Sequence, residues 1–245
     1  MAYYHCILFD MDGTLLDFEA AEHKALLDTF RQFGLPTDHE TEQLYVTINK
    51  ELWAALEKGQ IKRDKLLVER FARLLKKLGM QGNAAEMGRW YLNQLAMYPD
   101  AVPNALEAVR ELSEVATLAI VSNGVAKVQQ SRLKASGLEP YMDDVFISEQ
   151  IGVEKPNRRF FEHVLKTLGI EQREKVLVVG DSLSADIKGG QNAGLATCWC
   201  NFNDQPEPTQ NKPMYTIQSL QDLYSIVMEE DELQNVGLTH RKHQF

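Results

Sequence analysis

Two carboxylates stand one residue apart at the end of a short apolar run near the N-terminus. The run is Cys-Ile-Leu-Phe at residues 6–9, and Asp10-Met-Asp12-Gly13 follows at once. Such a run, without polar alternation and bounded by turn residues, is typical of a strand buried on both faces of a parallel sheet. Ligands bind at the carboxyl ends of these strands. We therefore expect Asp10 to be a nucleophile at a strand tip, and Asp12, with the same side-chain parity, to lie over the same crevice.

A calcium-binding loop would also explain an Asp-x-Asp-Gly sequence. In an EF-hand, however, the first ligand position would fall on Leu8, which cannot bind a hard cation, and a helix would have to precede it. The sequence thus disfavours a calcium loop. An ordinary acidic turn stays open for Asp10 and Asp12 taken alone, so partners elsewhere in the chain must decide.

Two further segments place polar groups after apolar or turn-rich stretches. Residues 116–121 form a second apolar run, and Ser122-Asn123-Gly follows it. A hydroxyl, an amide and a flexible backbone suit phosphate oxygens. Lys155-Pro precedes a helix expected to begin near Asn157. Each has a plainer alternative, because Ser-Asn-Gly is a common turn and most lysines are solvated surface charges.

A fourth segment resembles the first. The apolar run at residues 175–180 ends in Gly, Asp181 follows it, and Asp186 lies about one helical turn further on. The alternative for Asp181 alone is a helix cap.

Composition limits the function classes. The 245 residues are 44% hydrophobic, enough for a sizeable core, and the net charge of −9 disfavours binding to a nucleic-acid polymer. The sequence predicts neither a membrane span nor a secretion signal, so we expect a cytoplasmic protein. Cys6, Cys198 and Cys200 lie in apolar surroundings, and their odd number argues against a disulfide framework.

The chain divides by hydrophobic period. Residues 17–98 have a helical period, which predicts a small helical bundle inserted as a cap. Residues 1–16 and 99–228 alternate strands with helices, which predicts a parallel sheet core. Residues 229–245 are polar, contain two histidines, and are expected to form a tail.

Together the four segments resemble, in order, the four motifs of the haloacid dehalogenase superfamily of phosphatases. The resemblance implies an α/β fold with a Rossmann-like core and an inserted helical cap. It implies Asp10 as the nucleophile that forms an aspartyl-phosphate, and Asp12 as general acid and later base. It also implies phosphate binding by Ser122, Asn123 and Lys155, and support of the metal waters or Lys155 by Asp186.

A cation is required because two unit negative charges about 4 Å apart repel by roughly 4 kcal/mol at an effective dielectric near 20. The oxygen-rich set of Asp10, Asp181 and the Asp12 backbone carbonyl suits Mg²⁺.

Three stretches, residues 49–61, 147–157 and 189–199, resemble the branch of house-cleaning pyrimidine 5′-nucleotidases. That resemblance implies hydrolysis of pyrimidine nucleoside monophosphates such as UMP, dUMP and dTMP. The cap would select the substrate, and the candidate residues are Phe18, Asn49, Trp53 and Arg70. A packing role is the alternative for the aromatic pair.

Other functions on the same core stay open at this point: a sugar-phosphate or phosphoglycolate phosphatase, a phosphomutase, a 2-haloacid dehalogenase, and a catalytically silent binding protein. An acid at Asp12 disfavours the dehalogenase, since expelled halide needs no proton, and the intact set of acidic residues with Lys155 disfavours the silent protein.

Overall fold

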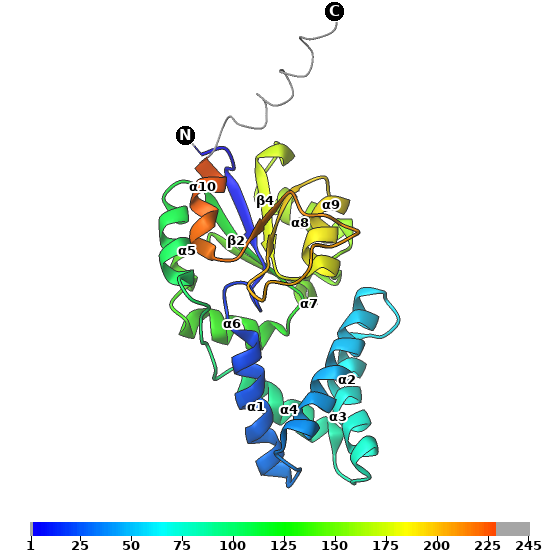
Figure 1. Ribbon diagram of the computed structural model, residues 1–245. Coiled ribbons are helices and arrows are strands. Elements are labelled where there is room, and N and C mark those ends of the chain that lie inside the picture. Colours follow the sequence, from blue (N-terminus) through cyan, green and yellow to red (C-terminus); the bar gives the residue numbers. More distant parts are fainter. Residues whose placement is uncertain (1, 229–245) are drawn as a thin grey trace, which may run out of the picture.

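The computed structural model describes residues 2–228, so the tail predicted at 229–245 and its histidines lie outside the described residues. In this part of the chain a six-stranded parallel sheet has the order β3-β2-β1-β4-β5-β6 (Figure 1). The strands are β1 (Cys6–Phe9), β2 (Thr117–Ser122), β3 (Asp144–Ile147), β4 (Val176–Gly180), β5 (Ala196–Cys200) and β6 (Tyr215–Ile217). The first strand is thus central, with its carboxyl end between those of β2 and β4.

Each central strand contributes to two hydrophobic clusters, one on each face of the sheet. Ile7 and Phe9 of β1 pack in one cluster, whereas Cys6 and Leu8 pack in the other. The first cluster includes side chains of α5 (Ala105–Ser113) and α10 (Leu223–Met228), and the second includes those of α8 (Arg158–Thr167). Burial on both faces explains why the strands read as apolar runs without alternation.

Shorter elements complete the core. They are α6 (Ala126–Ala135), α7 (Ser148–Ile151) and α9 (Lys188–Asn192), a π-helical turn η3 (Leu183–Ile187), and the 3₁₀ turns η1 (Glu139–Tyr141), η2 (Arg173–Lys175) and η4 (Leu220–Asp222). The three cysteines are free and buried in the sheet core.

Four helices between β1 and α5 form a separate cluster below the sheet in Figure 1: α1 (Phe18–Phe33), α2 (His39–Glu57), α3 (Arg63–Leu78) and α4 (Ala84–Leu95). Asp17, Asp38 and Asn83 cap three of them by accepting hydrogen bonds from backbone N–H groups in the first turn. Their apolar stripes meet around Tyr45 and Tyr91. The prediction of an α/β protein with a parallel sheet and a helical cap is confirmed.

The chain enters and leaves the cap through a paired neck, which we define as residues 15–17 and 100–102. The Asp17 N–H donates to Asp100 O at 2.9 Å and the Val102 N–H donates to Leu15 O at 3.0 Å. Leu16 pairs antiparallel with Ala101 between these two bonds. We propose residues 17–98 as the cap domain, and residues 1–16 with 99–228 as the core domain.

Within residues 2–228, no helix combines the length and the apolar character that crossing a membrane requires.

Candidate active site

Three neighbouring strands end in polar residues at the same edge of the sheet. Asp10 follows β1, Ser122 closes β2 and Asp181 follows β4, and β1 pairs in parallel with both other strands. The Asp10 N–H donates to Val179 O at 2.8 Å, which extends the pairing up to the nucleophile candidate. Parallel register therefore brings together side chains that lie 59 to 171 residues apart in the chain.

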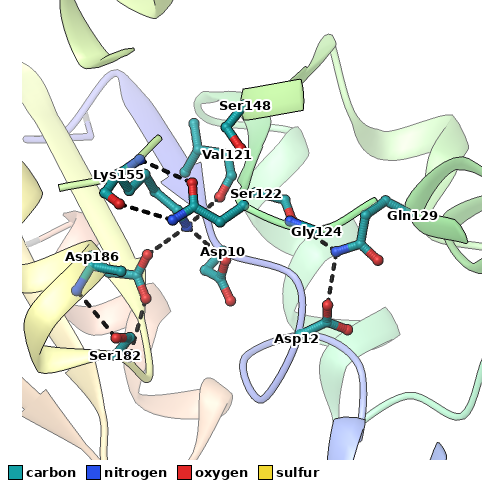
Figure 2. Close-up of polar contacts among 12 residues, drawn as sticks. Asp10, Asp12, Val121, Ser122, Gly124, Gln129, Ser148, Lys155, Ser182 and Asp186 are labelled. Atoms are coloured by element: carbon teal, nitrogen blue, oxygen red, sulfur yellow. Dashed lines mark hydrogen bonds and ion pairs between the residues drawn. The ribbon is translucent and has the colours of Figure 1, made fainter. Parts of the chain in front are cut away.

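Lys155 reaches this edge from the loop before α8 and is almost completely buried, with 1% of its surface exposed. Its Nζ donates to Asp10 Oδ1 at 2.7 Å, to Asp186 Oδ1 at 2.6 Å and to Val121 O at 2.6 Å (Figure 2). All three ammonium protons are used, so the side chain has one fixed position. The alternative that Lys155 is a solvated surface charge is therefore wrong.

The charges of this cluster influence one another strongly. Burial alone would lower the pKa of Lys155, but Asp10 and Asp186 outweigh it and hold that pKa above its ordinary value. Burial raises the pKa of Asp10 well above its ordinary value, against the opposing effect of Lys155. Lys155 therefore stays charged and only partly offsets the cost of burying the two carboxylates.

Asp181 stands at the exposed side of the cluster. Loss of water around its carboxylate and the nearby Asp186 raise its pKa to about 7, although the residue keeps an exposed surface. Its backbone is fixed by Trp199, whose Nε1 donates to Asp181 O at 2.9 Å. The helix-cap alternative for Asp181 is wrong, because Ser182 is the residue that caps η3 and accepts from the Ala185 N–H.

The donor set fits a hard divalent cation. Oxygen atoms of Asp10, Asp181 and Asp186 lie within 4.8 Å of one another. When all three carboxylates are ionised, the single positive charge of Lys155 leaves the cluster with a net charge of −2. Oxygen-only ligands with this charge suit Mg²⁺. Asp186 also accepts from the Ser182 N–H at 3.1 Å, so it is held by protein groups on both of its oxygens.

Gly13 allows the first motif to approach the fourth closely. It adopts a positive φ of 79°, and a Cβ at this position would stand 2.5 Å from Asp181 Oδ2. Any larger residue would therefore strain the backbone and displace a carboxylate of the site. Beyond the end of β1 the alternation of side chains no longer applies, and the Asp12 carboxylate contacts Gln129 and Arg132 of α6.

The two candidates at the end of β2, Ser122 and Asn123, differ in their contacts. Ser122 is buried, and its Oγ accepts from the Gly124 N–H at 3.0 Å and from Gln129 Nε2 at 2.7 Å. The Asn123 side chain instead forms two hydrogen bonds with the backbone of Lys155. Its Nδ2 donates to Lys155 O, and its Oδ1 accepts from the Lys155 N–H, both at 2.9 Å. Asn123 thus orients the Lys155 backbone, and its contact with phosphate stays a prediction.

Inside the cap, two of the substrate candidates meet around a buried acid. Asn49 Nδ2 donates to Glu22 Oε1 at 2.9 Å, and the Arg70 guanidinium lies 4.6 Å from the centre of the Tyr91 ring. Burial raises the pKa of Glu22 to about 7, and Arg70 opposes this increase. Asn49 Oδ1 and Arg70 Nη2 have no hydrogen-bond partner among the described residues.

The other two candidates lie at different edges of the cap. Trp53 is partly buried against the cap cluster, and Phe18 opens α1 beside Arg132, whose Cζ is 6.0 Å from the ring centre. Glu57, at the end of α2, approaches the core closely enough for Ser184, Asp186 and Lys155 to influence its pKa, which burial raises. The end of α2 therefore lies near the edge of the sheet where Lys155 and Asp186 meet.

Four contacting residues are absent from the set that the sequence predicts: Arg63, Gln129, Arg132 and Trp199. Arg63 Nη2 bridges the cap to the core by donating to Ser148 Oγ at 2.5 Å and to Asn123 O at 3.1 Å. None of the four lies in a strand-end motif. The one available signal was the spacing of Gln129 and Arg132, which places two polar side chains on one face of a helix.

Known proteins resemble the whole of this arrangement. The family model described as haloacid dehalogenase-like hydrolase matches residues 4–194. The pyrimidine 5′-nucleotidases PynA of Streptococcus pneumoniae and YjjG of Escherichia coli are 38% and 34% identical. Both alignments cover 90% of this chain, and they cover 94% and 96% of those proteins.

A solved structure is also similar. It is the crystal structure of the HAD-hydrolase YfnB of Bacillus subtilis bound to magnesium, with a TM-score of 0.87 and 39% identity. The match covers 91% of this chain and 98% of that chain.

Proposed function

The chain belongs to the haloacid dehalogenase-like hydrolase family, and on this premise we propose that it is a Mg²⁺-dependent 5′-nucleotidase for pyrimidine nucleoside monophosphates. One observation carries the catalytic part: a buried lysine ammonium joins Asp10 to Asp186 at the tip of the central strand, beside Asp181. The phosphatase activity belongs to the family. The choice of nucleotide is the finer part of the proposal.

Asp10 provides the nucleophile. Its Oδ1 is held by Lys155, so Oδ2 is the oxygen that attacks phosphorus. A bond forms between Oδ2 and phosphorus as the bond from phosphorus to O5′ of the nucleoside breaks, and Asp12 gives its proton to O5′. In the second half, Asp12 takes a proton from water, the water oxygen bonds to phosphorus, and the aspartyl-phosphate bond breaks to release phosphate and restore Asp10.

The remaining residues hold the phosphoryl group and its charge. Lys155 neutralises part of the charge that Asp10 and the phosphate bring together, and Ser122 lies at the adjacent strand end to accept or donate a hydrogen bond. Mg²⁺, held by Asp10, Asp181 and the Asp12 carbonyl, would supply electrostatic stabilisation of the transferring group. YfnB, which is bound to magnesium in its crystal structure, supports this assignment.

The cap supports a pyrimidine. One face of α2 carries Asn49, Trp53 and Glu57 at four-residue spacing. Glu57, at the end of this face, lies near Lys155 and Asp186. Within residues 2–228, the buried acceptor Asn49 Oδ1 and the buried donor Arg70 Nη2 have no hydrogen-bond partner. The imide edge of uracil or thymine offers one N–H donor flanked by carbonyl acceptors, which matches these two atoms. PynA and YjjG, both pyrimidine 5′-nucleotidases, support the same choice.

Phosphate release from matched substrates tests this proposal. We expect kcat/KM for UMP, dUMP and dTMP to exceed that for AMP, glucose phosphates and phosphoglycolate by about 10- to 200-fold, the range that differences in pocket shape alone provide. Asn49→Ala and Trp53→Ala should reduce the preference for pyrimidines more than the rate with p-nitrophenyl phosphate. If sugar phosphates or phosphoglycolate outrank every pyrimidine nucleotide, the nucleotidase proposal is wrong and the family activity alone stands.

A further inference from the structure

The Asp12 carboxylate is held on both oxygens by one helix of the core. Arg132 Nη1 forms an ion pair with Asp12 Oδ1, and Gln129 Nε2 donates to Asp12 Oδ2 at 2.8 Å (Figure 2 shows the Gln129 contact). Arg132 has none of its surface exposed and Gln129 has 2% exposed, whereas about a quarter of the Asp12 side chain is exposed. Two buried donors therefore fix an acid whose carboxylate stays partly exposed.

Arg132 is fixed in turn by both ends of the cap. Its Nε donates to Tyr98 O at 2.9 Å, in the segment that returns from α4 to the core. Its guanidinium also lies against the ring of Phe18, the first residue of α1. Ser131, its neighbour on α6, donates to Ala96 O at 3.2 Å. A movement of the cap relative to the core would therefore change the contacts that hold the Arg132 guanidinium.

Gln129 connects Asp12 to Ser122, the proposed phosphate-binding residue at the end of β2. The same Nε2 that donates to Asp12 donates to Ser122 Oγ at 2.7 Å. Gly124 makes this route possible, because a Cβ at that position would stand 2.5 Å from Gln129 Cδ. The two amide protons of Gln129 are thus shared between the group that binds phosphate and the group that protonates the leaving oxygen.

We propose that Arg132 and Gln129 are positioning residues for proton transfer by Asp12, and that Arg132 links the position of the cap to the orientation of this acid. The inference rests on the proposed phosphatase mechanism. Neither side chain acts on the substrate. Their effect is to hold the Asp12 carboxyl group where the leaving oxygen departs, so that protonation does not wait for a side-chain rotation.

Dependence on the leaving group separates this role from a structural one. A nucleoside alkoxide is a poor leaving group that needs protonation, whereas p-nitrophenolate leaves without it. Arg132→Met should lower kcat/KM for UMP about 10- to 100-fold and kcat/KM for p-nitrophenyl phosphate by less than about threefold. The ratio kcat/KM is the right measure because it excludes the later attack of water, in which Asp12 acts as base for both substrates. Gln129→Met should follow the same pattern with a smaller effect, and Arg132→Lys should recover part of the UMP rate.

Lys134→Met, which removes an exposed cation from the same helix, is the matched control and should leave both rates unchanged. Equal losses with both substrates, or no loss with UMP, would overturn the inference. Should Arg132→Met fail to fold, as judged by circular dichroism, Arg132→Lys and Gln129→Met carry the same comparison. Wild-type protein that hydrolyses neither substrate would instead refute the proposed function, and the two failures are therefore distinguishable.

Discussion

Asp10 presents one carboxylate oxygen, Oδ1, to Lys155, and the proposed mechanism uses the other oxygen as the nucleophile. Asp10→Asn should fold, because Lys155 retains Asp186 and Val121 O as acceptors, yet it should lose at least about a thousandfold in kcat, since an amide cannot replace the nucleophile. Phosphate release and intact-protein mass after brief reaction with substrate check both statements. Asp64→Asn, an exposed carboxylate on α3, is the control. Near-wild-type turnover by a pure Asp10→Asn sample would remove Asp10 from the role of nucleophile.

The sequence predicts the residues at strand ends better than those on helices. The sequence places Asp10, Ser122 and Asp181 at one edge of the sheet, because an apolar run predicts each strand and the residue at the end of that run must lie at this edge. Arg132 contacts Asp12 across 120 positions of the chain. No local pattern encodes which face of α6 meets the neck, so this contact and the bridge made by Arg63 needed the folded structure.

Among the elements, α3 joins the cap to the core through the buried Arg63. Arg63→Ala should free the cap from Ser148 and Asn123, raise KM for UMP about tenfold, and speed proteolysis near the neck. The physical reason is that these two hydrogen bonds hold the cap against the core beside the strand ends. Steady-state kinetics and limited trypsin digestion measure the two effects. Arg73→Ala, which removes an exposed arginine from the same helix, should change neither, and an unchanged KM in Arg63→Ala would contradict the closing role.

The interior of the cap should make stability depend on pH. The pKa of Glu22, ordinarily 4.5, is raised to about 7 in the folded protein by burial. The folded state therefore binds this proton more tightly, so the stabilisation is complete below pH 4.5 and is lost as the pH rises through 7. Between these limits the wild type should lose about 3 kcal/mol relative to Glu22→Gln. Denaturant unfolding of both proteins from pH 4.5 to 8 measures this difference, with Glu86→Gln as an exposed control. Parallel stability curves for wild type and Glu22→Gln would exclude a buried ionisation at this site.

For the whole molecule, the carboxylate cluster predicts that Mg²⁺ matters for activity more than for the fold. Chelation should abolish phosphate release while leaving the circular dichroism spectrum unchanged, because two hydrophobic clusters hold the sheet without the cation. Mg²⁺ at a hundredfold excess over its Kd should add about 2.7 kcal/mol of stability. Thermal unfolding with and without Mg²⁺ checks this value, and Asp181→Asn should show little shift. Full activity in excess chelator would contradict the metal role.

The neck closes the chain before the cap begins. Its two backbone hydrogen bonds and the pairing of Leu16 with Ala101 hold the two segments of the neck side by side as in a hairpin. We therefore expect that a tight turn of a few residues can replace residues 18–99. That shortened protein should fold, hydrolyse p-nitrophenyl phosphate slowly, and no longer discriminate among substrates; an unfolded product would show that the sheet depends on its insert. The first outcome would assign the chemistry to the strand ends and the choice of substrate to the insert, so that one insert could be exchanged for another without rebuilding the sheet.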